Sequence, residues 1–404
     1  MLHRFAPIFD RHSHVSLYAA LEGCPDLSAC IDPASALAQL RSLPGDRLSL
    51  VRGWHSGRLP LSEADLAELP PVLLVNLSLH GLRLSPRAVR LLRDTDPELV
   101  ARHADPAWCE RNLDRLLVLF GRTAGLTAAK LEAWIQGLEA AGVGAVEDLL
   151  LTGEEAWWVV RASRWADRLP WRTVPAIFDT LPTEAQAECA GLKVFTDGAL
   201  GARTAALDEP FLGGGPGLLL YTDEALHQEL ATLHARGKPL AIHAIGDRAI
   251  GQVLAALEDL DRQGLRFPSL RLEHVQFITE TQARRARDLG LVLSMQPNFS
   301  SDSVDYADRL GPATLARNNP FRMLIDQVGF RPGRDLIFGS DGMPHGLAYA
   351  AQWSLFPPFE GQRLGLEELL AGYGPAPGDL PVRELVVEAA TREVRLIGGS
   401  RWMS

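Results

Sequence analysis

Six side chains that can bind a metal ion occur within or directly after short apolar runs of the sequence. They are His12, His14, Lys193, His243, His274 and Asp341. In the run PIFDRHSH the two histidines are two residues apart, and because side chains alternate along a strand, both imidazoles can reach one ion. Imidazole and carboxylate ligands without a thiolate suit Zn²⁺, with Mn²⁺, Fe²⁺ or Co²⁺ as alternatives.

Each of these residues also has an ordinary structural interpretation. A single histidine at a strand end is usually hydrogen-bonded to its surroundings, and a buried lysine usually pairs with a carboxylate or extends its ammonium to solvent. The SDG sequence at Asp341 is common turn chemistry. Inward-facing residues at the carboxyl ends of barrel strands converge on one site, however, and the six together therefore favour a metal centre.

The elements that would position these residues are ten short runs rich in apolar and β-branched residues. They are residues 5–9, 48–54, 72–76, 144–150, 174–178, 192–196, 240–244, 270–275, 291–295 and 336–339. Runs such as VPAIF and PLAIHA are apolar at nearly every position, as parallel strands covered on both faces are. From 144 to 342 they alternate with helical stretches, in one of which Leu226, Leu230 and Leu233 form a single stripe.

This alternation predicts βα units and an α/β fold. Seven strands from residue 144 onward, together with residues 5–9, make the eight strands of a (β/α)₈ TIM barrel. The two other runs fall within residues 15–143, which we predict to be an insertion or lid subdomain after the first strand. The whole chain, residues 1–404, would then be one barrel with this insertion.

Composition limits the partners. The 404 residues carry a net charge of −10, which argues against binding to nucleic acid or an anionic membrane surface. No run of 18 uncharged apolar residues occurs, and the start of the chain lacks the apolar stretch of a signal peptide. The four cysteines show no CxxC spacing and are interpreted as reduced thiols. We expect a cytoplasmic protein with a small-molecule substrate, and homo-oligomerisation is compatible with the sequence.

The ordered set of six residues resembles that of the metal-dependent amidohydrolase superfamily. Three strings resemble its YtcJ-like branch, amidohydrolase family 3: LKVFTDGALGARTAAL (192–207), HAIGDRAI (243–250) and LRLEHVQFI (270–278). GWHSGRL (53–59), VGAVEDL (143–149) and GSDGMP (339–344) match more loosely. The resemblance covers most of residues 5–400, and a long insertion between barrel strands one and two is a feature of the family.

The resemblance implies a hydrolase that cleaves a C–N bond of an amide, N-acyl or cyclic-amide small molecule by metal-activated hydroxide. His12, His14 and Asp341 would hold one ion. Lys193, carboxylated to a carbamate, would bridge it to a second ion on His243 and His274; without carboxylation the site would hold one ion. Catalytic roles would fall to Asp341, which would orient the water and take its proton, and to His274 and Lys193.

Other positions have less distinctive roles. His80, Arg203 and His345 are candidate substrate contacts, and Asp247 and Arg248 are expected to anchor a loop through an ion pair. Strand alternation predicts that Glu273, next to His274, faces away from the site. The small β-sandwich that relatives build from both chain ends is expected to be lost or much reduced, because the first strand starts at residue 5.

Two alternative functions remain. One is a catalytically silent barrel that acts as a binding or scaffold protein, against which the presence of all six site residues argues. The other is an esterase or lactonase, or a phosphoesterase, since the same hydroxide can attack each of these substrates.

Overall fold

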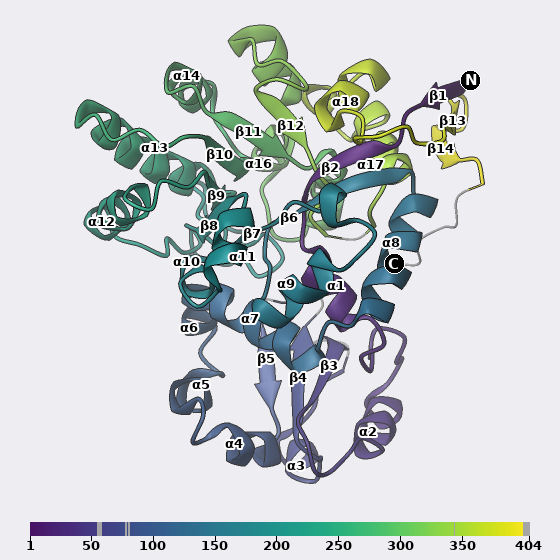
Figure 1. Cartoon of the computed structure of the whole chain (residues 1–404), viewed down its shortest axis with the longest axis vertical. Coiled ribbons are helices and arrows are strands. Elements are labelled where there is room, and N and C mark those ends of the chain that lie inside the picture. The colour runs from purple at the N-terminus through teal and green to yellow at the C-terminus, as the bar shows by residue number, and fades with distance from the viewer. Residues whose placement is uncertain (55–58, 77–78, 80, 343, 399–404) are drawn as a thin grey trace. The chain divides into compact units, whose positions relative to one another are not determined.

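In the computed structural model, residues 1–54, 59–76, 79, 81–342 and 344–398 are described (Figure 1). The chain divides into two compact units. One consists of Met1–Ser16 with Ala128–Ser404, and the other is Leu17–Thr127. The predicted insertion, residues 15–143, overlaps the second unit, and helix α1 (Val15–Leu21) spans the first boundary between the units.

The larger unit contains a parallel sheet of six strands in the order β12-β11-β10-β9-β8-β7. The strands are β7 (Arg172–Thr173), β8 (Gly191–Phe195), β9 (Leu240–Ala244), β10 (Leu270–His274), β11 (Val292–Met295) and β12 (Leu336–Phe338). Two further parallel strands, β2 (Ile8–Ser13) and β6 (Val143–Asp148), pair with each other. Parallel bridges link Ser13 to Asp341 and Asp148 to Trp171, so the pairing continues from β12 through β2 and β6 towards β7.

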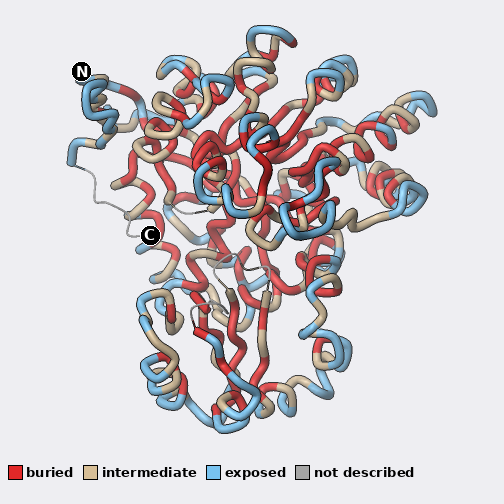
Figure 2. The backbone as a smooth tube through the Cα atoms, turned by 180° about the vertical axis from the view of Figure 1, so that it is seen from behind, coloured by how far each residue is buried: buried red, intermediate tan, exposed pale blue. Residues whose placement is uncertain are grey.

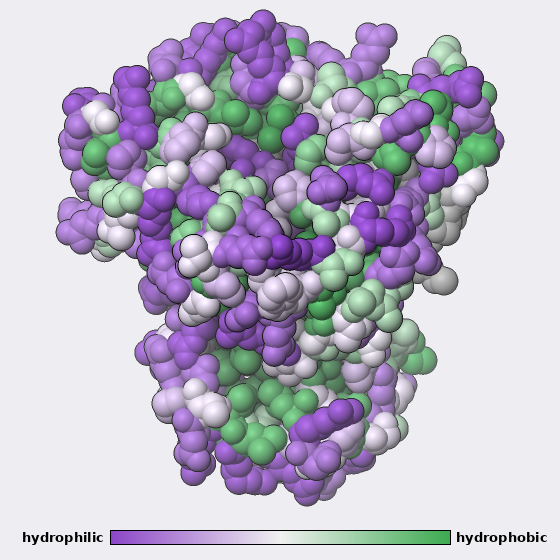
Figure 3. All heavy atoms as spheres, viewed as in Figure 1, coloured by the Kyte–Doolittle hydropathy of each residue, from purple (hydrophilic) through white to green (hydrophobic). Residues whose placement is uncertain are grey.

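Helices and short helical turns connect these strands, as expected for an α/β fold. They are α8 (Ala128–Ala140), α9 (Glu154–Arg161), η1 (Ala166–Arg168), α10 (Pro175–Phe178), α11 (Thr183–Glu188), α12 (Asp223–His234), α13 (Asp247–Arg262), α14 (Glu280–Asp288), η2 (Pro297–Ser301), α15 (Asp302–Asp305), α16 (Pro312–Arg317), the π-helix η3 (Met323–Val328), α17 (Leu347–Leu355), η4 (Glu360–Gln362) and α18 (Leu366–Tyr373). The strands are largely buried and the outer helical turns exposed (Figure 2). Hydrophilic side chains lie over the outer helices α12 and α13 (Figure 3).

The prediction of a strand over residues 174–178 is wrong. This segment is helix α10, and the strand β7 precedes it. A short apolar run does not distinguish a strand from a buried helical turn. Pro175 occupies the first turn of the helix, where its fixed φ suits the backbone and its missing N–H group costs no hydrogen bond.

Both chain ends contribute to a separate antiparallel sheet in the order β1-β13-β14. Its strands are β1 (Leu2–Phe5), β13 (Arg383–Glu388) and β14 (Glu393–Leu396), which lie side by side in Figure 1. The predicted first strand, residues 5–9, is therefore two strands, β1 and β2. A flanking sheet was expected to be lost or much reduced, and a three-stranded sheet is present. The reason given, that the first strand starts at residue 5, is wrong, because Leu2–Phe5 already form a strand that pairs with β13.

The smaller unit has its own three-stranded sheet and apolar core. Strand β3 (Ser49–Trp54) is parallel to β4 (Val72–Asn76), which is antiparallel to β5 (Leu82–Leu84). Its helices are α2 (Pro33–Arg41), α3 (Glu63–Ala67), α4 (Pro86–Leu92), α5 (Pro97–Arg102), α6 (Pro106–Arg111) and α7 (Leu113–Ala124). Four of them begin with an Asp or Ser cap followed by proline, a strong helix-start signal.

Two findings concern the whole described chain. Among the described residues, no helix is both long enough and apolar enough to cross a bilayer. All four cysteines are free thiols, as predicted from their spacing.

A chain of buried ion pairs runs between strands β6, β7 and β10. Glu147 accepts hydrogen bonds from Arg172 Nε and Arg271 Nη1, each at 2.5 Å. Burial raises the pKa of Glu147, but the two guanidinium groups outweigh this effect and hold that pKa below its usual range. The carboxylate is therefore charged at neutral pH and compensates two buried cations.

Replacing Glu147 with glutamine should lower the free energy of unfolding by about 3–5 kcal/mol, because two buried guanidinium groups lose their shared negative charge. Denaturant titration followed by circular dichroism measures this change. A Glu258→Gln variant breaks an ion pair with Arg285 in which both side chains are about one-third exposed, and it should change the free energy of unfolding far less. Equal losses in the two variants would contradict the prediction.

Candidate metal centre

His12, His274 and Asp341 form a buried cluster of potential metal ligands. One ligand atom from each lies within 4.8 Å of the others. His12 is in β2, His274 ends β10, and Asp341 follows β12. The distance from His12 Nε2 to Asp341 Oδ1 is 3.5 Å, and the two imidazole centroids are 4.8 Å apart. Three segments far apart in the sequence thus meet at the carboxyl ends of parallel strands.

His14 joins this cluster through the same carboxylate oxygen. Its Nε2 atom is 3.1 Å from Asp341 Oδ1. The two histidines of the HSH motif therefore both meet Asp341, which places them as the two-residue spacing predicts.

Lys193 and His243 lie beside this cluster. Lys193 is fully buried in β8, and within the described part of the chain its Nζ atom has no hydrogen-bond partner. The imidazole of His243 is 4.5 Å from that of His274, centroid to centroid. Its Nε2 atom is 3.1 Å from the carbonyl oxygen of Gly198, which leaves Nδ1 as the ring nitrogen available to a ligand. The structure thus gathers all six predicted residues in one region.

The backbone is strained at two residues of the cluster. His274 has φ of 71° and Asp341 has φ of 58°, in the left-handed region that residues other than glycine rarely adopt. Such conformations persist where surrounding contacts impose them, often at functional sites. Gly339 permits the close approach of β12 to β2, because a Cβ atom there would lie 2.3 Å from the backbone nitrogen of His12.

The prediction that Glu273 faces away from the site is wrong. Its Oε2 atom is 2.7 Å from His12 Nδ1, and the side chain is fully buried. Arg271 and Glu273, two residues apart, share the inner face of β10, where the Nε of Arg271 donates to Glu273 Oε1 at 2.8 Å. The strand alternation ends at His274, whose backbone is left-handed. The His274 side chain therefore reaches the centre as well as that of Glu273.

Gln296 was not predicted from the sequence. Directly after β11, its Oε1 atom is 2.8 Å from His274 Nδ1. Its position gave a usable signal, since it is a polar residue at the end of an apolar run like most of the predicted ligands. Asp10 was also missed; it accepts hydrogen bonds from the backbone nitrogen and hydroxyl of Ser340, next to Asp341.

Burial and neighbouring charge set the protonation of the centre. Burial lowers the pKa of His12 to about 4 and holds the pKa of His274 well below its ordinary value. Burial raises the pKa of Asp341, but His12 and His14 outweigh it and hold that pKa well below its usual range. Burial lowers the pKa of Lys193 to about 8. Neutral imidazoles and an ionised carboxylate are the forms that bind a metal ion.

The donor set therefore fits a divalent cation. His12 Nε2 is buried and, among the described residues, lacks a hydrogen-bond partner. A buried polar atom without a partner is costly unless a ligand satisfies it. Oxygen and nitrogen donors without thiolate are consistent with Zn²⁺ and with other divalent first-row metals.

The predicted substrate contacts differ in placement. His345 is buried, with its Nε2 atom 2.8 Å from the hydroxyl of Ser13, between the two histidines of the motif. Arg203 is exposed and its guanidinium lies 3.4 Å from the carbonyl oxygen of Leu212 in the same loop. His80 lies outside the described residues.

The expected ion pair between Asp247 and Arg248 is not formed. Asp247 instead pairs with Arg317 at 3.1 Å and accepts from the backbone nitrogen of Asp208. Adjacent side chains on a helix diverge, and Asp247 begins α13.

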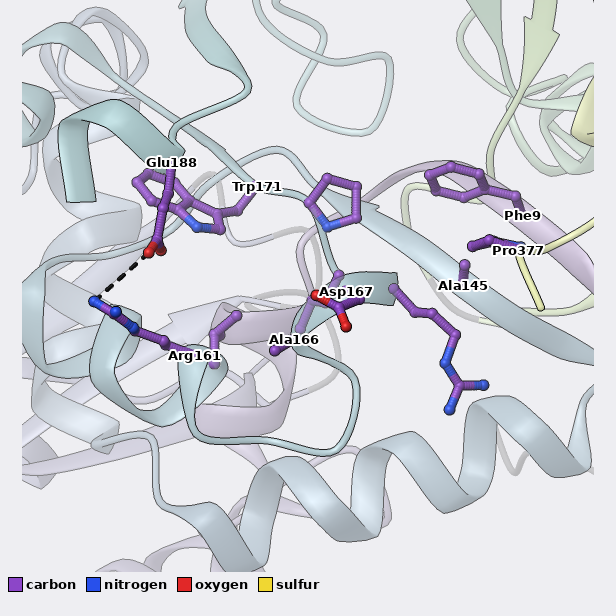
Figure 4. Close-up of a pocket in the computed structure, with 12 residues that line it drawn as sticks. Phe9, Ala145, Arg161, Ala166, Asp167, Trp171, Glu188 and Pro377 are labelled. Carbon is purple, nitrogen blue, oxygen red and sulfur yellow. Dashed lines mark ion pairs between the residues drawn. The ribbon is translucent and has the colours of Figure 1, made fainter. Parts of the chain in front are cut away.

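A separate cavity of about 540 Å³ lies near the amino-terminal ends of the strands (Figure 4). Phe9 and Ala145, near the starts of β2 and β6, line it together with the ion pair between Arg161 and Glu188. The cluster of His12, His274 and Asp341 lies at the opposite, carboxyl ends of the strands, so this cavity is separate from it.

Comparison with known proteins gives consistent matches. The model of the amidohydrolase family matches residues 5–352. The Bacillus subtilis (strain 168) protein named "Putative amidohydrolase YtcJ" is 26% identical over 364 residues, covering 80% of this chain and 68% of that protein. Crystal structures of uncharacterised metal-dependent hydrolases from Pyrococcus furiosus and Pyrococcus horikoshii OT3 align with TM-scores of 0.64 and 0.65. Each is 21% identical and covers 92% of this chain, with 81% and 80% of their own chains aligned, a likeness that concerns the fold.

Proposed function

The chain belongs to the amidohydrolase family, and we propose that it is a metal-dependent hydrolase that cleaves a C–N bond in an amide, N-acyl or cyclic-amide small molecule. The observation that carries the proposal is the buried cluster of His12, His274 and Asp341, whose ligand atoms lie within 4.8 Å of one another. Their placement at the carboxyl ends of parallel strands supports it, since barrel enzymes build their active sites there.

The proposal includes the architecture. We propose that the eight parallel strands β2 and β6–β12 close into a (β/α)₈ barrel, with residues 15–143 inserted after the first strand. The bridges from Ser13 to Asp341 and from Asp148 to Trp171 support closure, because they join the β2–β6 pair to both edges of the six-stranded sheet.

His12, His14 and Asp341 would hold one divalent cation, for which Zn²⁺ is the first candidate. Lys193 as a carbamate would bridge it to a second ion on His243 and His274. Bound there, the metal would supply Lewis acidity toward a water molecule and the substrate carbonyl. Oδ1 of Asp341 contacts both histidines of the motif, whereas Oδ2 lies 3.9 Å from His274 Nδ1. Oδ2 is thus the atom that would accept the proton of the attacking water and pass it to the leaving amine.

Carboxylation of Lys193 requires its neutral amine. Because burial lowers the pKa of Lys193 to about 8, more of the amine is neutral at physiological pH than for an exposed lysine. The lone pair of Nζ would form a bond to the carbon of CO₂ while the electrons of one C–O π bond move to oxygen, and the nitrogen would then lose one proton to solvent. The resulting carbamate is an anion, whereas an ammonium cannot bind a cation.

The silent-scaffold alternative is disfavoured, because a binding protein has no need to keep six ligating side chains in one buried region. Esters and lactones remain alternative substrates for the same centre, and the test below includes them.

The proposal predicts that purified protein contains one or two divalent ions and hydrolyses some member of a panel of amides, N-acyl compounds and cyclic amides. Elemental analysis by mass spectrometry measures the metal, and the panel should include matched esters and lactones. Removal of metal by a chelator should abolish activity, and added Zn²⁺ or Mn²⁺ should restore it. A protein that stays free of metal and inactive after loading would overturn the proposal.

A further inference from the structure

Two buried side chains outside the six predicted ligands hold the imidazoles of the centre through Nδ1. His12 Nδ1 is 2.7 Å from Glu273 Oε2, and His274 Nδ1 is 2.8 Å from Gln296 Oε1. Neither Glu273 nor Gln296 exposes any surface. An ionised carboxylate only accepts hydrogen bonds, so His12 must carry its proton on Nδ1.

This tautomer directs the other ring nitrogen towards the ligand cluster. With Nδ1 protonated, the lone pair of a neutral imidazole is on Nε2. His12 Nε2 is 3.5 Å from Asp341 Oδ1 and, in the described part of the chain, has no hydrogen-bond partner. The Nε2 atom of Gln296 is also 3.3 Å from His12 Nδ1, but two donors cannot pair, so the shorter contact with the carboxylate places the proton.

The carboxylate of Glu273 makes a second contact through the oxygen that does not face His12. Its Oε1 atom accepts from Arg271 at 2.8 Å, and Arg271 in turn pairs with Glu147, which also binds Arg172. The charges along this chain alternate, and all four side chains are at most 8% exposed. Gly191 leaves room for the guanidinium of Arg172, because a Cβ atom there would lie 2.1 Å from Arg172 Nη1. The carboxylate therefore has little freedom to leave His12.

We propose that Glu273 is a positioning residue that fixes His12 as the Nδ1-protonated tautomer with Nε2 directed at the ligand cluster. This inference rests on the proposed function, because it concerns how the chain prepares its ligands. Outer groups of this kind orient metal-binding histidines, and their loss commonly costs about 10–100-fold in metal affinity.

The test compares Glu273→Gln with Glu147→Gln. Both variants replace a buried carboxylate with an amide, but Glu147 is connected to Glu273 only through Arg271. Zn²⁺ affinity is measured by competition with a chromophoric chelator, and the tautomer of His12 by NMR of metal-free protein labelled with ¹⁵N-histidine. Glu273→Gln should weaken Zn²⁺ binding about 10–100-fold and mix the two tautomers, since an amide can present either an oxygen or an NH₂ group. Glu147→Gln should lose stability but keep the tautomer, and its affinity for Zn²⁺ should change only a few-fold.

Wild-type affinity together with a wild-type tautomer in Glu273→Gln would overturn the proposal. Equal losses of Zn²⁺ affinity in both variants would also overturn it, because they would indicate a general structural role. If Glu273→Gln does not fold, Glu273→Asp keeps the charge beside Arg271 while withdrawing the carboxylate from His12, and it should show the same loss. If the wild type binds neither Zn²⁺ nor Mn²⁺, the proposed function fails, whereas the tautomer of the metal-free protein still decides this inference.

Discussion

Replacing Asp341 with asparagine should lower kcat/KM by about 10²–10⁴-fold, the range expected when a general acid–base group is lost. The change keeps the size of the side chain but removes the charge that both His12 and His14 contact. An amide cannot take up the proton of the attacking water at neutral pH. Steady-state kinetics on the best substrate of the panel measures the loss.

The matched control is Asp247→Asn, a buried carboxylate in the same unit that pairs with Arg317 instead of a histidine. Its kcat/KM should stay within a few-fold of the wild type even if stability falls. An Asp341→Asn enzyme with near wild-type kcat/KM would show that this carboxylate does not move the proton. Metal analysis of the variant then separates loss of proton transfer from loss of the ion.

Long periodic patterns made much of the fold predictable. The run 240–244 is strand β9, and Leu226, Leu230 and Leu233, the predicted apolar stripe, are buried on α12. These signals are strong because burial on both faces of a strand, or on one face of a helix, determines residue type over many positions. The short run 174–178 carried no such information, since its apolar residues fit a buried helical turn equally well.

The ligands of the centre were predictable, but the residues that hold them were less so. His12, His274 and Asp341 each interrupt or end an apolar run, which singles them out in the sequence. Strand alternation predicts that Glu273 and His274 point to opposite faces, and it fails here because the left-handed backbone at His274 turns this imidazole to the side that Glu273 already faces. The sheet formed by both chain ends depends on pairing between β1 and β13, about 380 residues apart in the sequence.

Replacing Lys193 with alanine should remove most of the bound metal and nearly all activity, with partial rescue by a short carboxylate such as acetate or formate added in solution. Lys193 is fully buried beside His12 and Glu273, and its charge acts on the pKa of both. Bound cations would repel an unmodified ammonium there, whereas a carbamate would neutralise them. Alanine leaves a space in which a small anion can take the place of the carbamate.

The Lys193→Arg variant tests whether the carbamate is needed, because it removes the carbamate without leaving an empty space. Arginine keeps a positive charge, forms no carbamate at neutral pH and fills the volume, so it should be inactive and should not respond to added carboxylate. Mass spectrometry under native conditions should show the added CO₂ on the metal-bound wild type, and acid treatment should release it. An unmodified Lys193 beside one fully occupied ion would contradict the two-metal arrangement but leave a one-metal hydrolase, in which Asp341 still moves the proton.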